Sequence, residues 1–319
     1  MRCTSVGRAS LRPSLLFAVQ DAVLLAYLAI VAGLLACAEA SPAQARGIRG
    51  TLACGLALVL ACVVARGATS IPAAIRRNVY RAVFPGALFV NYACLRDILP
   101  VIRPDSVDLA LYELDLALFG VEPAVWLERW NLRPIVEWFS FFYLSYFLIC
   151  GVYLLLSVWI RRPGRHTTIC GIGTAFIFAV GQLGYMAVPG YGPGPALGHL
   201  FQAPVDGGFF WAWVVGSIEA ASALKDIFPS LHTAVPLWFA LWALEVARSD
   251  RRMLPLAQVT LFCAANIIVA TMLLRWHYAI DVLAGVALAA ATFVVATAAA
   301  RWEEARRDRL GASQPWIFR

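Results

Sequence analysis

The feature that most constrains the fold is a series of long apolar segments separated by short polar gaps. A helix needs about 20 mainly apolar residues to cross a bilayer. Hydrophobic residues make up 61% of the 319 residues and charged residues only 14%, which excludes an ordinary soluble domain. We therefore predict an all-α, polytopic membrane bundle of about eight transmembrane helices, six of which form the core. The apolar segments cover residues 15–37, 51–65, 83–102, 134–160, 168–189, 229–247, 254–274 and 278–300.

Two of these segments differ from the rest and suggest how the chain is divided. The segment at 51–65 is short, and the one at 83–102 contains Asn91, Arg96 and Asp97, which we expect to satisfy one another between helices. No long Ser, Gly or Pro linker interrupts the series. The predicted units are accessory N-terminal transmembrane helices over 1–82, one membrane domain over 83–300, and a basic cytoplasmic tail over 301–319.

Basic residues predict the orientation of the bundle. The net charge is +7, and most of the 26 Lys and Arg residues fall in alternate gaps of an eight-span arrangement. Short cytoplasmic loops are enriched in basic residues, so we expect both termini in the cytoplasm. The basic gaps are 1–14, 66–82, 161–167, 248–253 and 301–319.

The N-terminus permits a second interpretation. Arg12, the apolar run that follows it and the small residues at 38–40 are also typical of a cleaved signal peptide. Cleavage would leave seven spans and an external N-terminus. We favour an uncleaved anchor because the charge pattern of eight spans is self-consistent.

The sequence gives no sign of a metal or a cofactor. Its eight cysteines are scattered, mostly inside apolar segments, without the spacing of a metal site or of a paired motif. A carboxylate cluster of the kind that divalent-metal catalysis needs is also missing from the sequence. We therefore expect chemistry that uses neither.

Two of the four histidines lie in motifs that carry chemistry. Residues 226–233 read Asp-Ile-Phe-Pro-Ser-Leu-His-Thr, and Pro229 suits the first position of the helix that follows. The amides of Ser230, Leu231 and His232 would then point out of a helix start, which is an anion site. Residues 275–281 read Arg-Trp-His-Tyr-Ala-Ile-Asp. Its histidine and aspartate, four residues apart, share a helix face, so the carboxylate can orient the imidazole.

Topology brings the two motifs together. The span that starts near His232 runs toward the cytoplasm, and the next span returns toward His277. Both histidines should therefore lie at the same depth on the non-cytoplasmic face. Two imidazoles, a carboxylate, a guanidinium and a helix N-terminus form an inventory that suits phosphoryl transfer.

At these motifs the chain resembles the type-2 phosphatidic acid phosphatase superfamily. Phe-Pro-Ser-Leu-His-Thr and Arg-x-His-Tyr-x-x-Asp look like its second and third motifs, and the branch that contains inositol phosphorylceramide synthase is the most similar. The resemblance covers roughly residues 114–300. Supporting stretches are Leu-Asp-x-x-Leu-Phe-Gly at 114–120, Tyr-Leu-Ser-Tyr at 143–146, and the Gly- and Pro-rich run at 184–195.

The resemblance implies catalytic roles for three residues. His277 would attack phosphorus and form a phosphohistidine, and Asp281 would orient His277. His232 would protonate the departing oxygen and later activate the acceptor. Candidates for binding the substrate phosphate are Arg275, Ser230, Lys225, Tyr191 and Gly192.

Each phosphate-binding candidate also has a purely structural interpretation. Arg275 could anchor a helix end, Ser230 could be a helix cap, and Lys225 could pair with Asp226 at the loop surface. Tyr191 and Gly192 could shape a re-entrant turn over the site. Asp115, within one of the supporting stretches, could likewise be a cap or loop residue.

The chain departs from the phosphatase branch in two places. Its Arg-Arg-Pro at 161–163 has no lysine seven positions before the second arginine and belongs to the opposite face. Ala270 and Thr271 stand where the phosphatases have Ser-Arg. These departures favour a lipid phosphotransferase that moves a phosphoryl headgroup onto ceramide, diacylglycerol or a polyprenol. The alternatives are a lipid phosphate or polyprenyl diphosphate phosphatase and, from another class, a non-enzymatic transporter or scaffold.

The expected partners are membrane lipids, as donor and as acceptor, and no nucleic acid; the oligomeric state is left open. Lys225 is the only lysine among the basic residues, which favours a GC-rich bacterial source. The protein would then lie in the inner membrane. Its active site would be on the periplasmic face, with the loops at 103–133 and 190–228.

Overall fold

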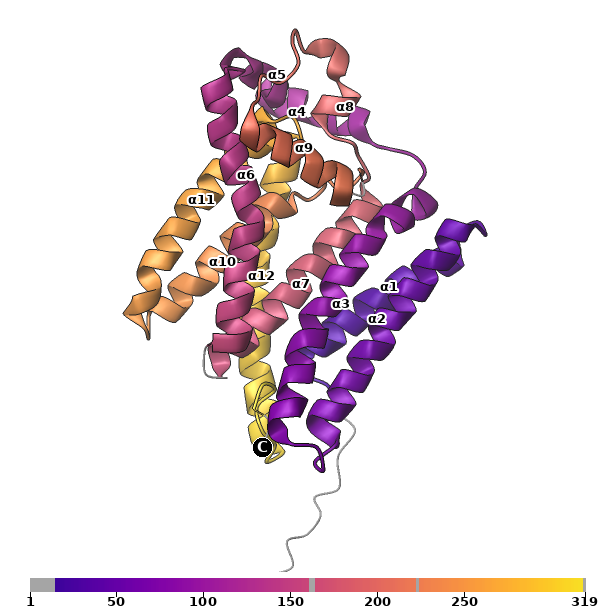
Figure 1. Ribbon diagram of the computed structural model, residues 1–319, viewed down its shortest axis with the longest axis vertical. Helices are drawn as coiled ribbons and strands as arrows, with labels where there is room; N and C mark the ends of the chain where they lie inside the picture. The colour runs from indigo at the N-terminus through magenta and orange to yellow at the C-terminus, as the bar shows by residue number, and fades with distance from the viewer. Residues whose placement is uncertain (1–14, 161–163, 222–223, 318–319) are drawn as a thin grey trace, which may run out of the picture.

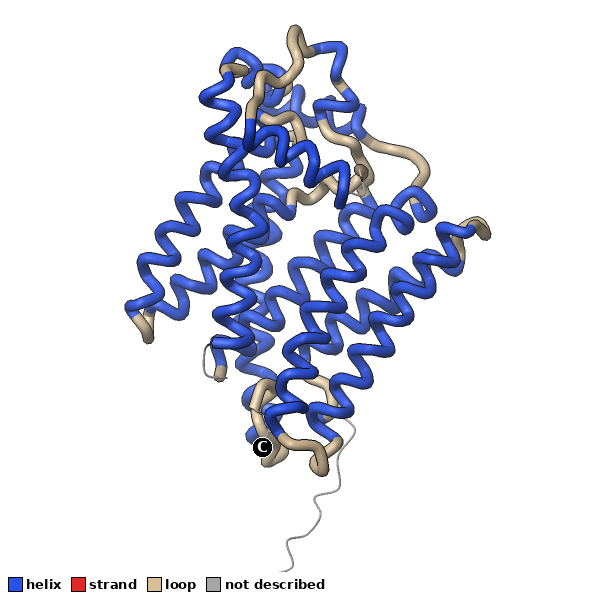
Figure 2. The backbone as a smooth tube through the Cα atoms, in the orientation of Figure 1, coloured by secondary structure: helices blue, strands red, loops and turns tan. Residues whose placement is uncertain are grey.

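The computed structural model describes residues 15–160, 164–221 and 224–317, and over these residues it contains helices and loops but no strand (Figure 2). This confirms the predicted all-α membrane bundle. In the described part of the chain, seven helices are long and apolar enough to cross a membrane, and α10 (Leu231–Ala247) is a shorter apolar helix. The long helices are α1 (Val19–Ala36), α2 (Pro42–Gly67), α3 (Ala73–Ile102), α6 (Arg133–Leu154), α7 (Arg165–Ala187), α11 (Leu254–Leu273) and α12 (Ala279–Arg309).

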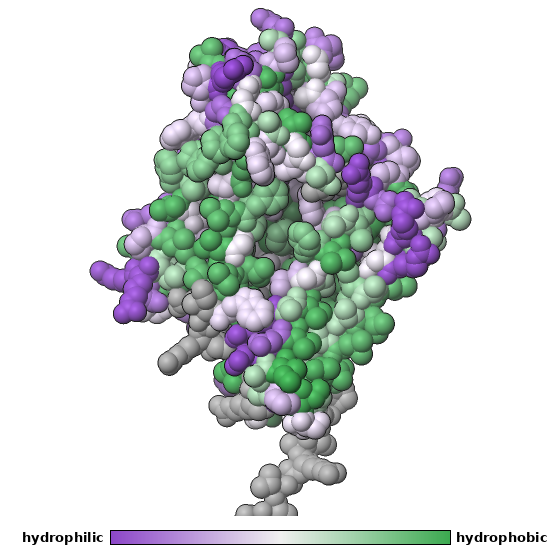
Figure 3. Space-filling model, in the orientation of Figure 1, coloured by the Kyte–Doolittle hydropathy of each residue, from purple (hydrophilic) through white to green (hydrophobic). Residues whose placement is uncertain are grey.

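Short helices gather at one end of the bundle, opposite the C-terminal end of α12 (Figure 1). The view in Figure 3 shows a largely apolar surface over the long helices and a more hydrophilic surface at this end. Exposed apolar side chains on the long helices suit contact with lipid chains. The short helices are α4 (Asp108–Phe119), α5 (Pro123–Leu127), α8 (Pro193–Ala196) and α9 (Phe209–Ala221).

The helix α3 is longer than the sequence predicted. It begins at Ala73 rather than near residue 83, so the predicted boundary between 82 and 83 falls inside one continuous helix. The polar first turns are stabilised because the guanidinium of Arg76 donates to the Ala65 carbonyl, 3.0 Å away, near the end of α2. Arg76 thus caps the C-terminal end of α2 from within α3, where the sequence predicted a loop.

The polar residues of α3 do not satisfy one another as predicted. Asn91 accepts a hydrogen bond from the Tyr27 hydroxyl at 2.5 Å, and Asp97 forms an ion pair with Arg46 at 2.8 Å. Arg96 donates to the Glu219 carbonyl of α9 at 3.4 Å. Each of these side chains therefore links α3 to a different helix.

The C-terminal tail returns to the bundle. Its residue Trp316 is 1% exposed and packs against Tyr80 and Phe84 of α3, with ring centroids 5.0 and 5.8 Å apart. A Cβ on Gly171 of α7 would lie 2.8 Å from the indole, so only glycine leaves room for it. The tail thus packs against both α3 and α7. The Arg-Arg-Pro at 161–163 and the N-terminal residues 1–14 lie outside the described residues.

We expect Trp316→Ala to destabilise the protein by about 3 kcal/mol, because it leaves a cavity the size of an indole between α3 and α7. The matched control is Trp302→Ala on α12, whose side chain is 54% exposed. Thermal unfolding in detergent micelles measures both changes. Equal losses in the two variants would show that the tail does not hold the bundle together.

Candidate active site

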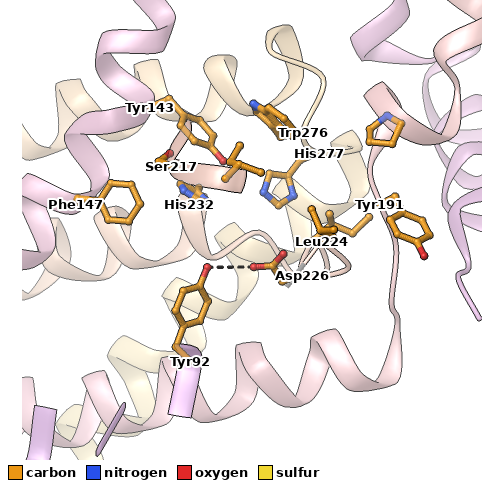
Figure 4. A pocket seen from close by; sticks show the side chains of 13 residues that line it. Tyr92, Tyr143, Phe147, Tyr191, Ser217, Leu224, Asp226, His232, Trp276 and His277 are labelled. Atoms are coloured by element: carbon orange, nitrogen blue, oxygen red, sulfur yellow. Dashed lines mark hydrogen bonds between the residues drawn. The ribbon is translucent and has the colours of Figure 1, made fainter. Parts of the chain in front are cut away.

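The two motif histidines share one cavity. His232 lies in the first turn of α10 and His277 in the turn between α11 and α12, and their ring centroids are 6.1 Å apart. Both line a cavity of about 220 Å³ (Figure 4). The structure therefore brings the two motifs together at one cavity, as the sequence predicted.

Asp281 contacts His277 as the spacing predicted. Its Oδ2 lies 3.3 Å from Nδ1 of His277 and accepts the backbone N–H of Tyr278 at 3.0 Å. The second bond makes Asp281 part of the N-terminal cap of α12. Both side chains are almost fully buried, at 3% exposure for His277 and 0% for Asp281. The carboxylate can therefore fix the tautomer in which Nδ1 of the imidazole carries the proton.

Burial keeps the imidazole of His277 neutral. Removal from solvent lowers its pKa to about 4, against an opposing effect of the negative charge of Asp226. A neutral ring with its Nδ1–H directed at a carboxylate presents Nε2 as a nucleophile.

This shift gives a prediction for pH. Between pH 6.5 and 4 the unfolded chain carries a proton on residue 277 that the folded protein lacks, so His277 costs the protein stability as pH falls through that window. We expect His277→Asn to lose less thermal stability than the wild type between pH 6.5 and 4. Melting temperatures at a series of pH values measure the difference. Parallel curves would contradict a neutral, buried imidazole.

Aromatic rings from α6 hold His232. The imidazole stacks on Tyr143, with centroids 4.4 Å apart and planes 18° apart, and lies 4.4 Å from the ring of Tyr146. Its buried Nε2 has no hydrogen-bond partner among the described residues. Such an atom is rare in a folded protein and is available to a ligand oxygen. Tyr143 and Tyr146 were predicted only as part of the family resemblance, although their spacing of three already places them on one helix face.

Helix α10 begins later than the sequence predicted. Its first residue is Leu231 and its N-cap is Ser230, so Pro229 precedes the helix. The hydroxyl of Ser230 accepts the Thr233 amide at 3.3 Å, and the Ser230 amide donates to the Asp281 carbonyl at 3.0 Å. Ser230 is therefore a cap that joins α10 to α12, and its N–H is already used.

The amides of Tyr191 and Gly192 are also occupied, by a residue that the sequence analysis did not single out. Asp108 accepts both, at 2.9 and 3.0 Å, and accepts the hydroxyl of Tyr278 at 3.1 Å. Gly192 has a φ of +86°, and a Cβ there would lie 2.3 Å from the Trp276 carbonyl. The chain thus makes a tight turn against Trp276, and of these two residues only Tyr191 lines the cavity.

Asp115 holds the start of α12. Its carboxylate accepts the amides of Ala279 and Ile280 at 2.7 and 2.9 Å. Burial raises the pKa of this carboxyl, and the two amides oppose that rise. Asp115 is thus placed as a helix cap beneath the His277 turn, the structural alternative given for it.

Neither predicted cation reaches the cavity. Arg275 forms an ion pair with Glu128 at 3.2 Å, and its guanidinium lies 3.9 Å from the ring centroid of Phe201. The ammonium of Lys225 binds the backbone carbonyls of Arg103, Pro104 and Asp105. Both are buried in these contacts rather than directed at the histidines.

The cavity wall is aromatic and contains one carboxylate. Besides the histidines, Asp226 is the single charged side chain among the described residues of the wall. A group of three or more His, Cys, Asp or Glu residues that could hold a metal ion is not found in the described parts of the chain. The other lining residues are Tyr92, Tyr143, Phe147, Tyr191, Pro195, Ser217, Ile218, Leu224, Ile227 and Trp276.

Comparison with known proteins identifies a family for the chain. Neither the curated proteins nor the solved structures contain a match to the chain. The family model of the PAP2 superfamily, the type-2 phosphatidic acid phosphatases, matches residues 109–295, which is more than half of the chain and includes both histidine motifs. The chain belongs to the PAP2 superfamily.

Proposed function

We propose that the protein is an integral membrane lipid phosphotransferase that works through a phosphohistidine at His277. The observation that carries the proposal is the pair of buried histidines on one cavity, their ring centroids 6.1 Å apart. Asp281 orients His277, and His232 has a buried ring nitrogen without a partner in the described structure. These are the nucleophile, its orienting group and a proton donor.

The first half-reaction cleaves the donor lipid at its bond between phosphorus and the lipid oxygen. Nε2 of His277 attacks phosphorus, and the bond from phosphorus to the lipid oxygen breaks on the opposite side. His232 gives its proton to that oxygen, which leaves as the free lipid alcohol. Asp281 accepts a hydrogen bond from Nδ1–H of His277 and stabilises the positive charge that develops on the imidazole ring.

The second half-reaction restores the enzyme. An acceptor hydroxyl attacks the phosphohistidine, and His232 takes the hydroxyl proton. The bond between phosphorus and Nε2 breaks, which returns His277 to its neutral form. A lipid alcohol as acceptor gives a new phospholipid or phosphosphingolipid, whereas water gives hydrolysis.

One observation favours transfer over phosphatase activity. Phosphate monoesters carry close to two negative charges and need several cations, whereas a phosphodiester carries one. The lining of the cavity, in the described residues, includes neither Lys nor Arg. A phosphodiester donor of the kind used by inositol phosphorylceramide synthases suits such a site better than a phosphate monoester. Hydrolysis of a lipid phosphate is the second candidate.

We place this reaction on the extracytoplasmic face of a bacterial inner membrane. The cavity is lined by His232, in the first turn of α10, and by Tyr191, just before α8. The turn between α10 and α11, which contains Arg248, Arg251 and Arg252, lies away from the end that holds α4, α5, α8 and α9 (Figure 1). The basic loops would then face the cytoplasm.

The test follows the phosphorus of labelled donors in lipid with the purified protein. Phospholipids labelled at the headgroup phosphate are mixed with ceramide, diacylglycerol or a polyprenol, and the lipid products and free phosphate are separated. Label on a second lipid is the expected result. Release of free phosphate alone would make the enzyme a phosphatase, and the absence of both products would contradict the proposal.

A further inference from the structure

The single carboxylate of the cavity lies where a substrate headgroup would have to fit. Asp226 is in the loop before α10, and Figure 4 places it between the side chains of Tyr92 and His277. The Tyr92 hydroxyl donates to Oδ2 of Asp226 at 3.2 Å. We propose that Asp226 and Tyr92 select the headgroup of the donor lipid, and that this headgroup is hydroxylated or positively charged. The inference rests on the proposed function and deepens it.

Charge is the first argument. A carboxylate beside the reacting phosphate repels any additional negative charge on the substrate, and it attracts hydroxyl and ammonium donors. Arg275, held by Glu128, and Lys225, held by backbone carbonyls, do not line the cavity. The cavity therefore discriminates against a phosphate monoester and in favour of a phosphodiester with a donor-bearing headgroup.

The shape and lining of the cavity are the second argument. Its volume of about 220 Å³ is below the roughly 300–1,000 Å³ of sites that enclose whole drug-sized ligands, so it suits a headgroup rather than a complete lipid. Four aromatic side chains besides Tyr92 line it. Aromatic faces attract ammonium groups and pack against the carbon faces of polyols. Those side chains are Tyr143, Phe147, Tyr191 and Trp276.

The origin of Tyr92 is the third argument. It belongs to α3, which lies outside the segment 109–295 that matches the PAP2 superfamily, whereas Asp226 lies inside it. A helix outside the matched segment thus supplies part of the cavity wall, through Tyr92, and a partner for its carboxylate. Selection of the headgroup is then a property that this chain adds to the shared catalytic segment.

The test measures binding apart from turnover. Short-chain forms of phosphatidylinositol, phosphatidylglycerol, phosphatidylcholine, phosphatidylethanolamine and phosphatidic acid are titrated into the full-length protein in micelles by calorimetry. We expect at least one polyol or ammonium headgroup to bind about tenfold more tightly than phosphatidic acid. The panel also separates hydroxyl recognition from recognition of positive charge.

Two variants assign that preference to the proposed residues. Asp226→Asn should bring the ratio of the two affinities close to one, weakening the preferred lipid and strengthening phosphatidic acid. Tyr92→Phe should shift the ratio in the same direction by a smaller factor. If Asp226→Asn fails to fold, the ratio measured for Tyr92→Phe tests the proposal instead. The controls Asp206→Asn, at an exposed loop, and Tyr112→Phe, outside the cavity, should keep the wild-type ratio.

The outcomes separate the inference from the proposed function. A wild type that prefers phosphatidic acid, or a ratio that neither variant changes, overturns the inference even if labelled lipid is still formed. A ratio that depends on Asp226 in a protein that forms no labelled product supports the inference and rejects the transferase. If both variants lose affinity equally for every lipid, Asp226 and Tyr92 have a purely structural role, and the inference is also overturned.

Discussion

Replacing His277 with alanine is expected to lower kcat/KM for phosphoryl transfer by at least about 10⁴-fold, because the reaction loses its nucleophile. The ring is buried beside Asp281 in the wall of the cavity, whereas the other imidazole there, that of His232, stacks on Tyr143 and has no Asp281 contact. The measurement is the rate at which label moves from donor to acceptor lipid. Folding is checked by the thermal unfolding midpoint in the same micelles.

Two controls accompany this variant. His199→Ala removes an exposed histidine outside the cavity and should leave the rate unchanged. His277→Gly leaves space for added imidazole, which should restore part of the activity. A His277→Ala protein that is folded and keeps more than about a tenth of the wild-type rate would rule out the covalent mechanism.

His232→Gln is the second large effect, with an expected loss of about 10²- to 10⁴-fold in kcat/KM for a natural lipid donor. The departing lipid oxygen is a poor leaving group without a proton, and His232 is the residue placed to supply it. A glutamine keeps a polar side chain in the space between Tyr143 and Tyr146 but cannot exchange a proton.

A donor with an activated leaving group separates proton donation from positioning. A p-nitrophenyl phosphodiester needs no proton to release its alcohol, so His232→Gln should keep an initial burst of p-nitrophenol and lose the later turnover. His277→Ala should show no burst. Loss of the burst in His232→Gln would show that His232 positions the substrate rather than acting as an acid.

The pairing of the two histidines was predictable from the sequence because it depends on topology alone. A span that starts at His232 and a span that ends before His277 must place the residues at the same end when they are joined by one short turn. The contact between His277 and Asp281 follows from a spacing of four on a helix start. Local periodicity and alternation of spans therefore determine the arrangement of these three residues.

The phosphate-binding candidates were less predictable, because the partner of a polar group depends on loops that are distant in sequence. Arg275 meets Glu128, and the amides at 191 and 192 meet Asp108, across separations that no local pattern encodes. Lys225 binds the loop after α3 for the same reason. A short motif fixes the position of the Cα atom of such a residue, but the position of the charged group at the end of a long side chain depends on its distant partners.

Helix boundaries show the same limit. The sequence suggested a first helical position for Pro229, yet the helix begins after Ser230, whose hydroxyl caps Thr233 and whose amide meets Asp281. The cap is stabilised by a tertiary contact to α12. Propensity at one position cannot anticipate such a contact, which exists only when the two motifs are already packed together.

The most direct test of the central claim is to trap the covalent intermediate. Wild-type protein and the variants His232→Gln and His277→Ala are incubated briefly with a p-nitrophenyl phosphodiester labelled at phosphorus, whose leaving group needs no proton from His232, and quenched in alkali. The modified peptide is then identified by mass spectrometry. The account predicts an acid-labile, base-stable phosphoryl group on His277 in the first two proteins and none in the third. Label on another residue, or continued turnover without any label on His277, would contradict it.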